Sequence, residues 1–265
     1  MDRTMGDVCG ALADQHAELW GLIAGLDDGG WQRPSRCEGW DVADVVLHMA
    51  QTDEMALATL EGRAGSSQGS GFLGVDPATL EDSGLGPGAT VDDLAAWAVE
   101  RERGAPGPQV AERWRNAAEK LRATLVGYDP HQRVRWVSGQ VSSVSLATTR
   151  LAECWIHTGD VAEALGRPQE PAERLRFVAR LAWRTLPYAF SRAGKELHGP
   201  VAFHLHGPDG DRWDFDPDDE PLTVVEGDGF ELCLVAAQRV TAADTKLQAT
   251  GPDAADVLDL VRTYA

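Results

Sequence analysis

The chain has 265 residues, of which 43% are hydrophobic, so it can bury a core in one large domain or two small ones without disulfide bonds. Its 42 acidic residues against 24 basic ones give a formal net charge of -18 at pH 7, which repels nucleic acid and anionic membrane surfaces. No stretch approaches the roughly 18 consecutive apolar residues of a membrane span, and the acidic N-terminus is not typical of a signal peptide. The four cysteines form no CxxC pair, which argues against a zinc ribbon or a redox dithiol. We therefore expect a cytoplasmic protein with reduced thiols that acts on a small molecule, binds neither nucleic acid nor membrane, and is a monomer or homodimer.

Apolar residues recur at helical spacing along the first part of the chain. This spacing predicts helices over 5–26, 42–60, 91–103, 109–126 and 142–165, the second of them capped by Asp41. The segment before Asp41 and the one that begins at Tyr128 are predicted as connections. Residues 61–90 are rich in Gly and Ser and form a surface excursion, either a lid or an insertion. The pattern is typical of an antiparallel four-helix bundle.

The last hundred residues change character. After a helix over 171–193, apolar and polar residues alternate in "VAFHLHG", "DRWDFDP" and "PLTVVEG", which predicts strands, the first two joined by a hairpin turn. "GFELCLVAAQRV" is predicted as a helix, "TKLQATG" as a strand, and residues 252–265 as a final helix. We expect an α+β chain with a helical domain over 1–168 and a small α/β domain over 169–265.

Three residues of the predicted bundle indicate a metal site. Glu153 and His157 are four residues apart on an apolar helix, so they share one face, and a carboxylate there is costly unless it is paired or metal-bound. Such a pair alone is usually a pair of surface neighbours. His48 lies in the middle of another apolar helix, where a lone His is more often a core residue. If the two helices face each other, two His and one Glu form a ligand set known from open zinc sites and related to non-haem iron triads.

The sequence resembles the mycothiol-dependent maleylpyruvate isomerase family, which has a DinB-like fold. The likeness rests on "GWDVADVVLHMAQTDE" at 39–54 and "RLAECWIHTGDVAEALG" at 150–166, together with the upstream "WQRPSRCEGW". The C-terminal part is similar to the small sterol-carrier-like α/β domain of that family, and "GFELCLVAAQR" resembles its helix ending in Arg. The most similar branch is actinobacterial, and its members are mostly described only as metal-binding proteins.

The resemblance implies functions for particular residues. It implies that His48, Glu153 and His157 hold a divalent metal, with Zn²⁺ expected, and that mycothiol or another low-molecular-weight thiol is a cofactor. Asp160 and Arg239 are the candidate catalytic residues. Asp160 is either an acceptor for an imidazole N–H or proton carrier, or simply a solvated Asp. Arg239 is either a clamp for a substrate carboxylate or an exposed Arg at a helix end.

Other chemistry-bearing residues receive less specific interpretations. Cys154 is expected to point away from the metal and pack as a small apolar group, because adjacent helix residues point about 100° apart. The chemistry of Cys37 is open. Asp53 and Glu54 contribute a proton or only solvate their helix, and His16 and His131 are structural or surface residues. His204 and His206 share one face of a strand but lack a third ligand.

Three hypotheses for the function follow. The first is a metal-dependent enzyme on a small molecule, a thiol-dependent isomerase or thiol transferase of the maleylpyruvate isomerase type. The second is a metal- or ligand-binding protein without turnover. The third is a metal-dependent hydrolase or cyclase of specialised metabolism on the same scaffold.

Overall fold

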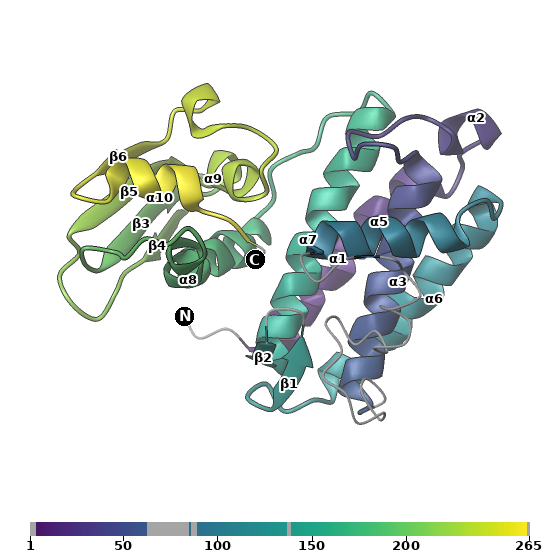
Figure 1. Ribbon diagram of the computed structural model, residues 1–265, viewed down its shortest axis with the longest axis horizontal. Coiled ribbons are helices and arrows are strands. Elements are labelled where there is room, and N and C mark those ends of the chain that lie inside the picture. Colours follow the sequence, from purple (N-terminus) through teal and green to yellow (C-terminus); the bar gives the residue numbers. More distant parts are fainter. Residues whose placement is uncertain (1–3, 63–84, 86–88, 137–138, 264–265) are drawn as a thin grey trace. The chain divides into compact units, whose positions relative to one another are not determined.

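The computed structural model describes residues 4–62, 85, 89–136 and 139–263 of the chain (Figure 1). The chain divides into two compact units, Met1–Gln169 and Glu170–Ala265. No helix within the described ranges is long and apolar enough to cross a membrane. The α+β class expected from the sequence is confirmed, with a helical first unit and a mixed second unit.

The first unit is built on a bundle of long helices. Its members are α1 (Met5–Ile23), α3 (Val42–Leu60), α6 (Gly107–Val126) and α7 (Ser143–Ala164). Helices α1 and α3 each pack against both α6 and α7, and the shorter α5 (Val91–Glu102) lies against α3. Leucine, valine and alanine side chains from these helices form the buried core. The predicted four-helix bundle is therefore confirmed.

Local sequence signals fix where several of these helices begin. The Asp41 side chain accepts a hydrogen bond from the Asp44 backbone N–H, and the Asp44 side chain accepts one from the Asp41 N–H. The same reciprocal pattern joins Thr4 to Asp7 at the start of α1. Such capping boxes satisfy backbone donors that a helix start leaves unpaired. The cap at Asp41 therefore sets the position of every later residue of α3, including His48.

Two short structures lie in segments that were predicted as connections. Helix α2 (Asp28–Trp31) is a single turn, and the Asp27 side chain before it accepts a hydrogen bond from the Gly30 N–H. Strands β1 (Arg133–Trp136) and β2 (Gly139–Ser142) pair antiparallel. The interpretation of both segments as plain connections was wrong, because a one-turn helix and two four-residue strands are too short to show a period. The predicted excursion over 61–90 lies almost entirely outside the described residues.

The second unit combines a small mixed sheet with helices. Its strands are β3 (Val201–His206), β4 (Arg212–Phe215), β5 (Thr223–Asp228) and β6 (Gln248–Thr250), in the order β4-β3-β5-β6. Strands β3 and β5 run parallel, and the other neighbouring pairs run antiparallel. Its helices are α8 (Leu175–Arg192), α9 (Gly229–Ala236) and α10 (Ala254–Leu260), with a short 3₁₀ turn η2 (Ala242–Asp244).

The last two helices are shorter than predicted. Helix α9 ends at Ala236 because Gln238 adopts a left-handed backbone conformation with a φ of 58°. Helix α10 ends at Leu260, and the backbone N–H of Thr263 donates to the carbonyl of Ala236 instead of continuing the helix. A contact between residues this far apart in sequence cannot be read from local spacing.

His16 is buried in the bundle in its neutral form. The residue is 3% exposed, its Nδ1 lies 2.6 Å from Nη1 of Arg122, and its ring packs edge-on with that of Trp114 with centroids 5.6 Å apart. Burial, reinforced by the positive charges of Arg122 and Arg150, lowers the pKa of His16 to about 3. The expectation that His16 is structural is consistent with this burial.

We predict that His16 makes the bundle less stable in acid. Because the unfolded His16 takes up a proton below a pH of about 6.5 and the folded one does so only near 3, the unfolded state binds more protons in that window. Stability should therefore fall as the pH is lowered from about 6.5, by at most about 1.4 kcal/mol per pH unit from this group. Urea unfolding at several pH values measures the slope, which His16→Gln should reduce and His131→Gln, at an exposed site, should not. An unchanged slope in His16→Gln would contradict the assignment of a lowered pKa to the folded His16.

Candidate metal centre

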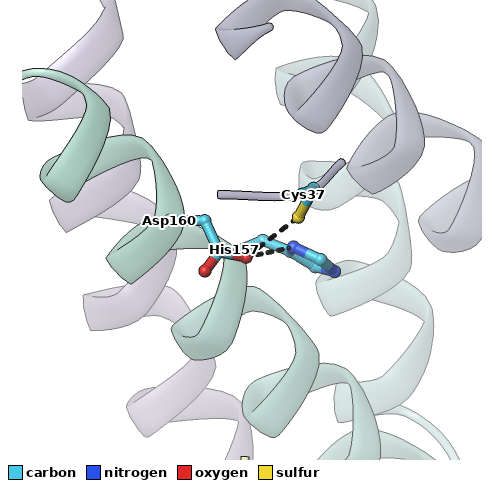
Figure 2. A group of neighbouring side chains, drawn as sticks. All are labelled: Cys37, His157 and Asp160. Carbon is cyan, nitrogen blue, oxygen red and sulfur yellow. Dashed lines mark hydrogen bonds and ion pairs between the residues drawn. The ribbon is translucent and has the colours of Figure 1, made fainter. Parts of the chain in front are cut away.

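Helix α7 places three of the candidate side chains on one face. Glu153, His157 and Asp160 follow one another at spacings of four and three residues, which brings them to the same side of a helix. His157 Nδ1 lies 2.9 Å from Oδ2 of Asp160, and Sγ of Cys37 lies 3.4 Å from the same oxygen (Figure 2). Asp160 is 1% exposed, so its interpretation as a solvated Asp was wrong. Its carboxylate fixes the orientation of the His157 ring.

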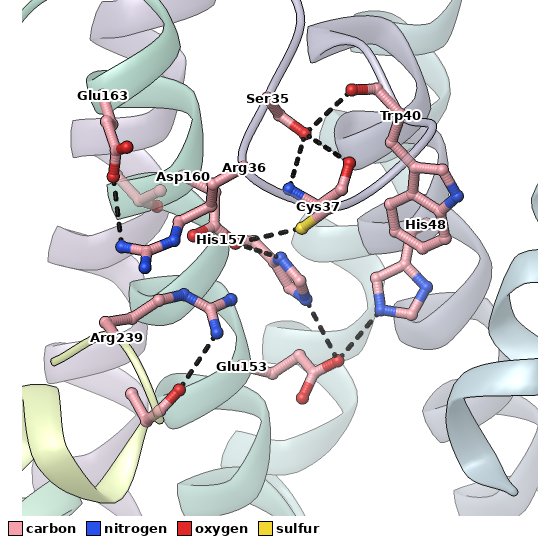
Figure 3. Close-up of polar contacts among 12 residues, drawn as sticks. Ser35, Arg36, Cys37, Trp40, His48, Glu153, His157, Asp160, Glu163 and Arg239 are labelled. Carbon is pink, nitrogen blue, oxygen red and sulfur yellow. Dashed lines mark hydrogen bonds and ion pairs between the residues drawn. The ribbon is translucent and has the colours of Figure 1, made fainter. Parts of the chain in front are cut away.

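The other ring nitrogen of His157 faces helix α3. His157 Nε2 lies 3.7 Å from Oε1 of Glu153, and His48 Nε2 lies 3.0 Å from that same oxygen (Figure 3). The two imidazole rings meet edge to face, with centroids 5.0 Å apart. One ligand atom from each of the three residues lies within 4.8 Å of the others. The structure therefore brings His48 to Glu153 and His157, and His48 lies 105 residues before Glu153 in sequence.

The charges of the three groups are set by burial and by their mutual contacts. Burial alone would raise the pKa of Glu153, but the nearby His157 and His48 rings and the charge of Arg150 hold this pKa well below its usual value. Burial lowers the pKa of His48 in spite of its bond to Glu153. Burial also opposes the charged form of His157, yet Asp160, Cys37 and Glu153 together hold its pKa well above the usual value. These shifts favour the charged form of Glu153, the neutral form of His48 and the protonated form of His157.

A tight turn before α3 covers one side of the centre. Trp40 places its ring against His48, with centroids 5.2 Å apart, and Cys37 reaches Asp160 from the same turn (Figure 3). The contact of Trp40 with His48 was not predicted. The Gly-Trp pair before Asp41 was the only available signal in the sequence, and it gives no direction for the ring.

A buried ion pair ties α3 to α7 next to the centre. Arg150 Nε lies 3.0 Å from Oδ1 of Asp53, its Nη2 donates to Oγ1 of Thr52 at 2.8 Å, and both charged side chains are 1% exposed. Of the two interpretations of Asp53, the one in which it only solvates its helix was therefore wrong. Its neighbour Glu54 turns instead to the surface pair with Arg113 at 2.8 Å.

Cys154, His204 and Arg239 are not among the residues whose ligand atoms meet in this centre. Cys154 is fully buried, with its Sγ 3.9 Å from Oγ1 of Thr158, and burial raises the pKa of its thiol, so it packs as expected. His204 pairs with Asp216 at 2.9 Å. Arg239 belongs to the second unit, where its Nη1 donates to the carbonyl of Ala237 at 3.0 Å. Its proposed contact with a substrate stays a prediction.

Comparison with known proteins places this chain in a family. Residues 12–162, more than half of the chain and all of the centre, match the model of the mycothiol maleylpyruvate isomerase N-terminal domain. The chain belongs to this family. The family resemblance inferred from the two signature stretches is thus confirmed.

Two relatives and two solved structures extend the comparison over nearly the whole chain. The uncharacterized proteins MT0041 and Rv0036c of Mycobacterium tuberculosis are each 30% identical over 266 aligned residues, 98% of this chain and 97% of theirs. A crystal structure of the mycothiol-dependent maleylpyruvate isomerase and one of a single-residue variant of it share 16% identity with this chain, with TM-scores of 0.60 and 0.62. Each covers 96% of this chain and 97% of its own, so this family member shares their fold in both units.

Proposed function

We propose that His48, Glu153 and His157 bind one divalent metal ion, with Zn²⁺ as the expected ion. Two imidazoles and one carboxylate are a common ligand set of open zinc sites, which leave a coordination position for water or substrate. The observation that carries the proposal is the convergence of both Nε2 atoms on the single oxygen Oε1 of Glu153.

The residues present fit a cation at this place. His157 has a carboxylate near each ring nitrogen, Asp160 at Nδ1 and Glu153 at Nε2. A neutral imidazole carries one N–H, so when it donates to Asp160 its Nε2 lone pair faces the Glu153 carboxylate. A cation between the Nε2 lone pair and the Glu153 carboxylate removes their electrostatic repulsion. Without a cation, a second proton on the His157 ring does the same.

Asp160 is expected to support metal binding without contacting the ion. Outer-shell partners of metal-bound imidazoles typically change metal affinity by about 10–100-fold when they are replaced. We predict a loss of this size in Asp160→Ala, measured by competition with a chromophoric chelator, because the His157 ring loses the acceptor at 2.9 Å that orients it. Glu163→Gln, on the exposed end of the same helix, is the control. Equal affinities in the two variants would contradict this role of Asp160.

We further propose that the chain is a thiol-dependent isomerase or thiol transferase acting on a small electrophilic acid. The bound ion would lower the pKa of a thiol and so make its thiolate available near neutral pH. Support comes from membership of the family and from the likeness in fold to a mycothiol-dependent maleylpyruvate isomerase. Arg239, as a planar cation, is the residue that we propose to bind a substrate carboxylate.

The chain's own residues would prepare this chemistry in separate ways. Asp160 holds the His157 ring, and Trp40 packs against the His48 ring, so both imidazoles are oriented before any ligand arrives. The side chain of Glu153 is 24% exposed, whereas that of His48 is 9% exposed. We therefore expect a thiol or substrate to approach from the side of Glu153.

Turnover by the metal-loaded protein tests this function. Mycothiol and maleylpyruvate are supplied together and separately, with the isomer followed by absorbance and any thioether adduct of other electrophilic acids by mass spectrometry. We expect product only with the thiol present and a large loss in Glu153→Gln. Neither turnover nor thiol binding would favour a non-catalytic metal- or ligand-binding protein, and thiol-independent hydrolysis would favour a hydrolase or cyclase.

A further inference from the structure

The thiol of Cys37 is held in place by an ordered turn. The backbone N–H of Cys37 donates to Oγ of Ser35 at 3.1 Å, and its carbonyl accepts from the N–H of Trp40 at 3.0 Å. Gly39 allows this turn because its φ is 77°, a conformation that side chains disfavour. Cys37 is partly exposed, whereas Cys9, Cys154 and Cys233 are buried. The turn therefore presents one accessible thiol at a fixed place.

That place is the side of His157 that faces away from Glu153. Sγ of Cys37 lies 3.4 Å from Oδ2 of Asp160, and that oxygen lies 2.9 Å from His157 Nδ1 (Figure 2). One ligand atom each from Cys37, His157 and Asp160 lies within 4.8 Å of the others. Because the contact with Asp160 uses Nδ1 and the contact with Glu153 uses Nε2, the two groups of side chains do not compete for the same nitrogen.

We propose that Cys37, Asp160 and Nδ1 of His157 form a second metal-binding set, adjacent to the first and selective for a thiophilic divalent cation such as Zn²⁺ or Co²⁺. Thiolate, imidazole and carboxylate together are ligand types that zinc takes in proteins, and the thiolate disfavours hard ions such as Mg²⁺. On binding, the Cys37 thiol and Nδ1 of His157 each release a proton to solvent, and the cation takes the place of both protons. This set needs neither His48 nor Glu153, so it goes beyond the proposed function.

The two sets are linked through His157. An ion at Nδ1 replaces the hydrogen bond to Asp160 that orients the ring toward Glu153. Filling one set must therefore change the affinity of the other, and the change is the same in both directions. The second set can in this way tune the metal content of the first.

Cobalt(II) alone is the probe that separates the two sets. Thiolate-bound Co²⁺ absorbs in the near ultraviolet by charge transfer, whereas nitrogen and oxygen ligands alone do not give this band. We expect the band in the wild type and in His48→Ala, its loss in Cys37→Ser and His157→Ala, and its retention in the matched control Cys154→Ala. Circular dichroism checks that each variant is folded.

A second measurement on the unaltered chain avoids any dependence on variants. Zn²⁺ should slow the alkylation of Cys37 by iodoacetamide, read by peptide mass spectrometry, and Mg²⁺ should not. The proposal is overturned if the wild type lacks the thiolate band, if the band persists in Cys37→Ser, or if it disappears in a folded His48→Ala protein. The first set is tested separately: if Cys37→Ser binds no cobalt at all, then His48, Glu153 and His157 do not hold an ion.

Discussion

Replacing Arg150 by Met is expected to lower the free energy of unfolding by about 3–5 kcal/mol. The substitution leaves the Asp53 carboxylate buried at 1% exposure without its cation, and its Oδ2 already has no hydrogen-bond partner. Burial raises the pKa of Asp53 even with Arg150 in place, which shows how poorly this site tolerates an uncompensated charge. Urea unfolding near neutral pH, followed by circular dichroism, measures the loss.

Two further variants make this result specific. Arg113→Met removes the half-exposed pair with Glu54, which joins α6 to α3, and should cost at most about 1 kcal/mol. The double replacement Arg150→Met with Asp53→Leu should recover much of the loss, because no buried charge is left behind. If Arg150→Met lowers the free energy of unfolding no more than Arg113→Met does, the buried pair is no more important for stability than the exposed one.

The second large effect is expected at Glu153. Glu153→Gln keeps the shape of the side chain but removes the negative charge that faces both imidazoles through Oε1. We expect metal affinity to fall by more than the roughly 10–100-fold that is typical when a hydrogen-bond partner of a metal ligand is replaced. Competition with a chelator measures it.

Glu163→Gln is the control for this substitution. It makes the same chemical change on the same helix, at a side chain that is 62% exposed and pairs with Arg36 at 3.2 Å. Its metal affinity should equal that of the wild type, and both variants should keep the helical signal. An equal affinity of Glu153→Gln and the wild type would show that the carboxylate is not a ligand.

The bundle and most of its helix starts could be predicted from the sequence because their causes are local. The capping residue Asp41 and the apolar period after it specify α3, which begins at Val42 and ends at Leu60 as expected. The pairing of Glu153 with His157 follows from the geometry of one helix. Their meeting with His48 was an inference from a bundle of facing helices, and the contact at 3.0 Å agrees with it.

The features that could not be predicted depend mostly on contacts between residues that are distant in sequence. Asp53 lies 97 residues from Arg150, and Cys37 lies 123 residues from Asp160. Neither partner carries a local signal for the other, so Asp53 was taken for a solvated or proton-transferring group and the chemistry of Cys37 stayed open. The short pairing of β1 with β2 was missed for a different reason, because four-residue strands show too little alternation.

The metal content of the purified protein tests the central claim most directly. After reconstitution with zinc, nickel or iron and removal of free ion by gel filtration, elemental analysis gives the bound metal per chain. The convergence of His48, Glu153 and His157 predicts at least about one equivalent in the wild type, as for other sites of this ligand type, and a clear loss in Glu153→Gln. Less than about a tenth of an equivalent of each metal in the wild type would contradict the claim, because a site of this kind binds its ion stoichiometrically.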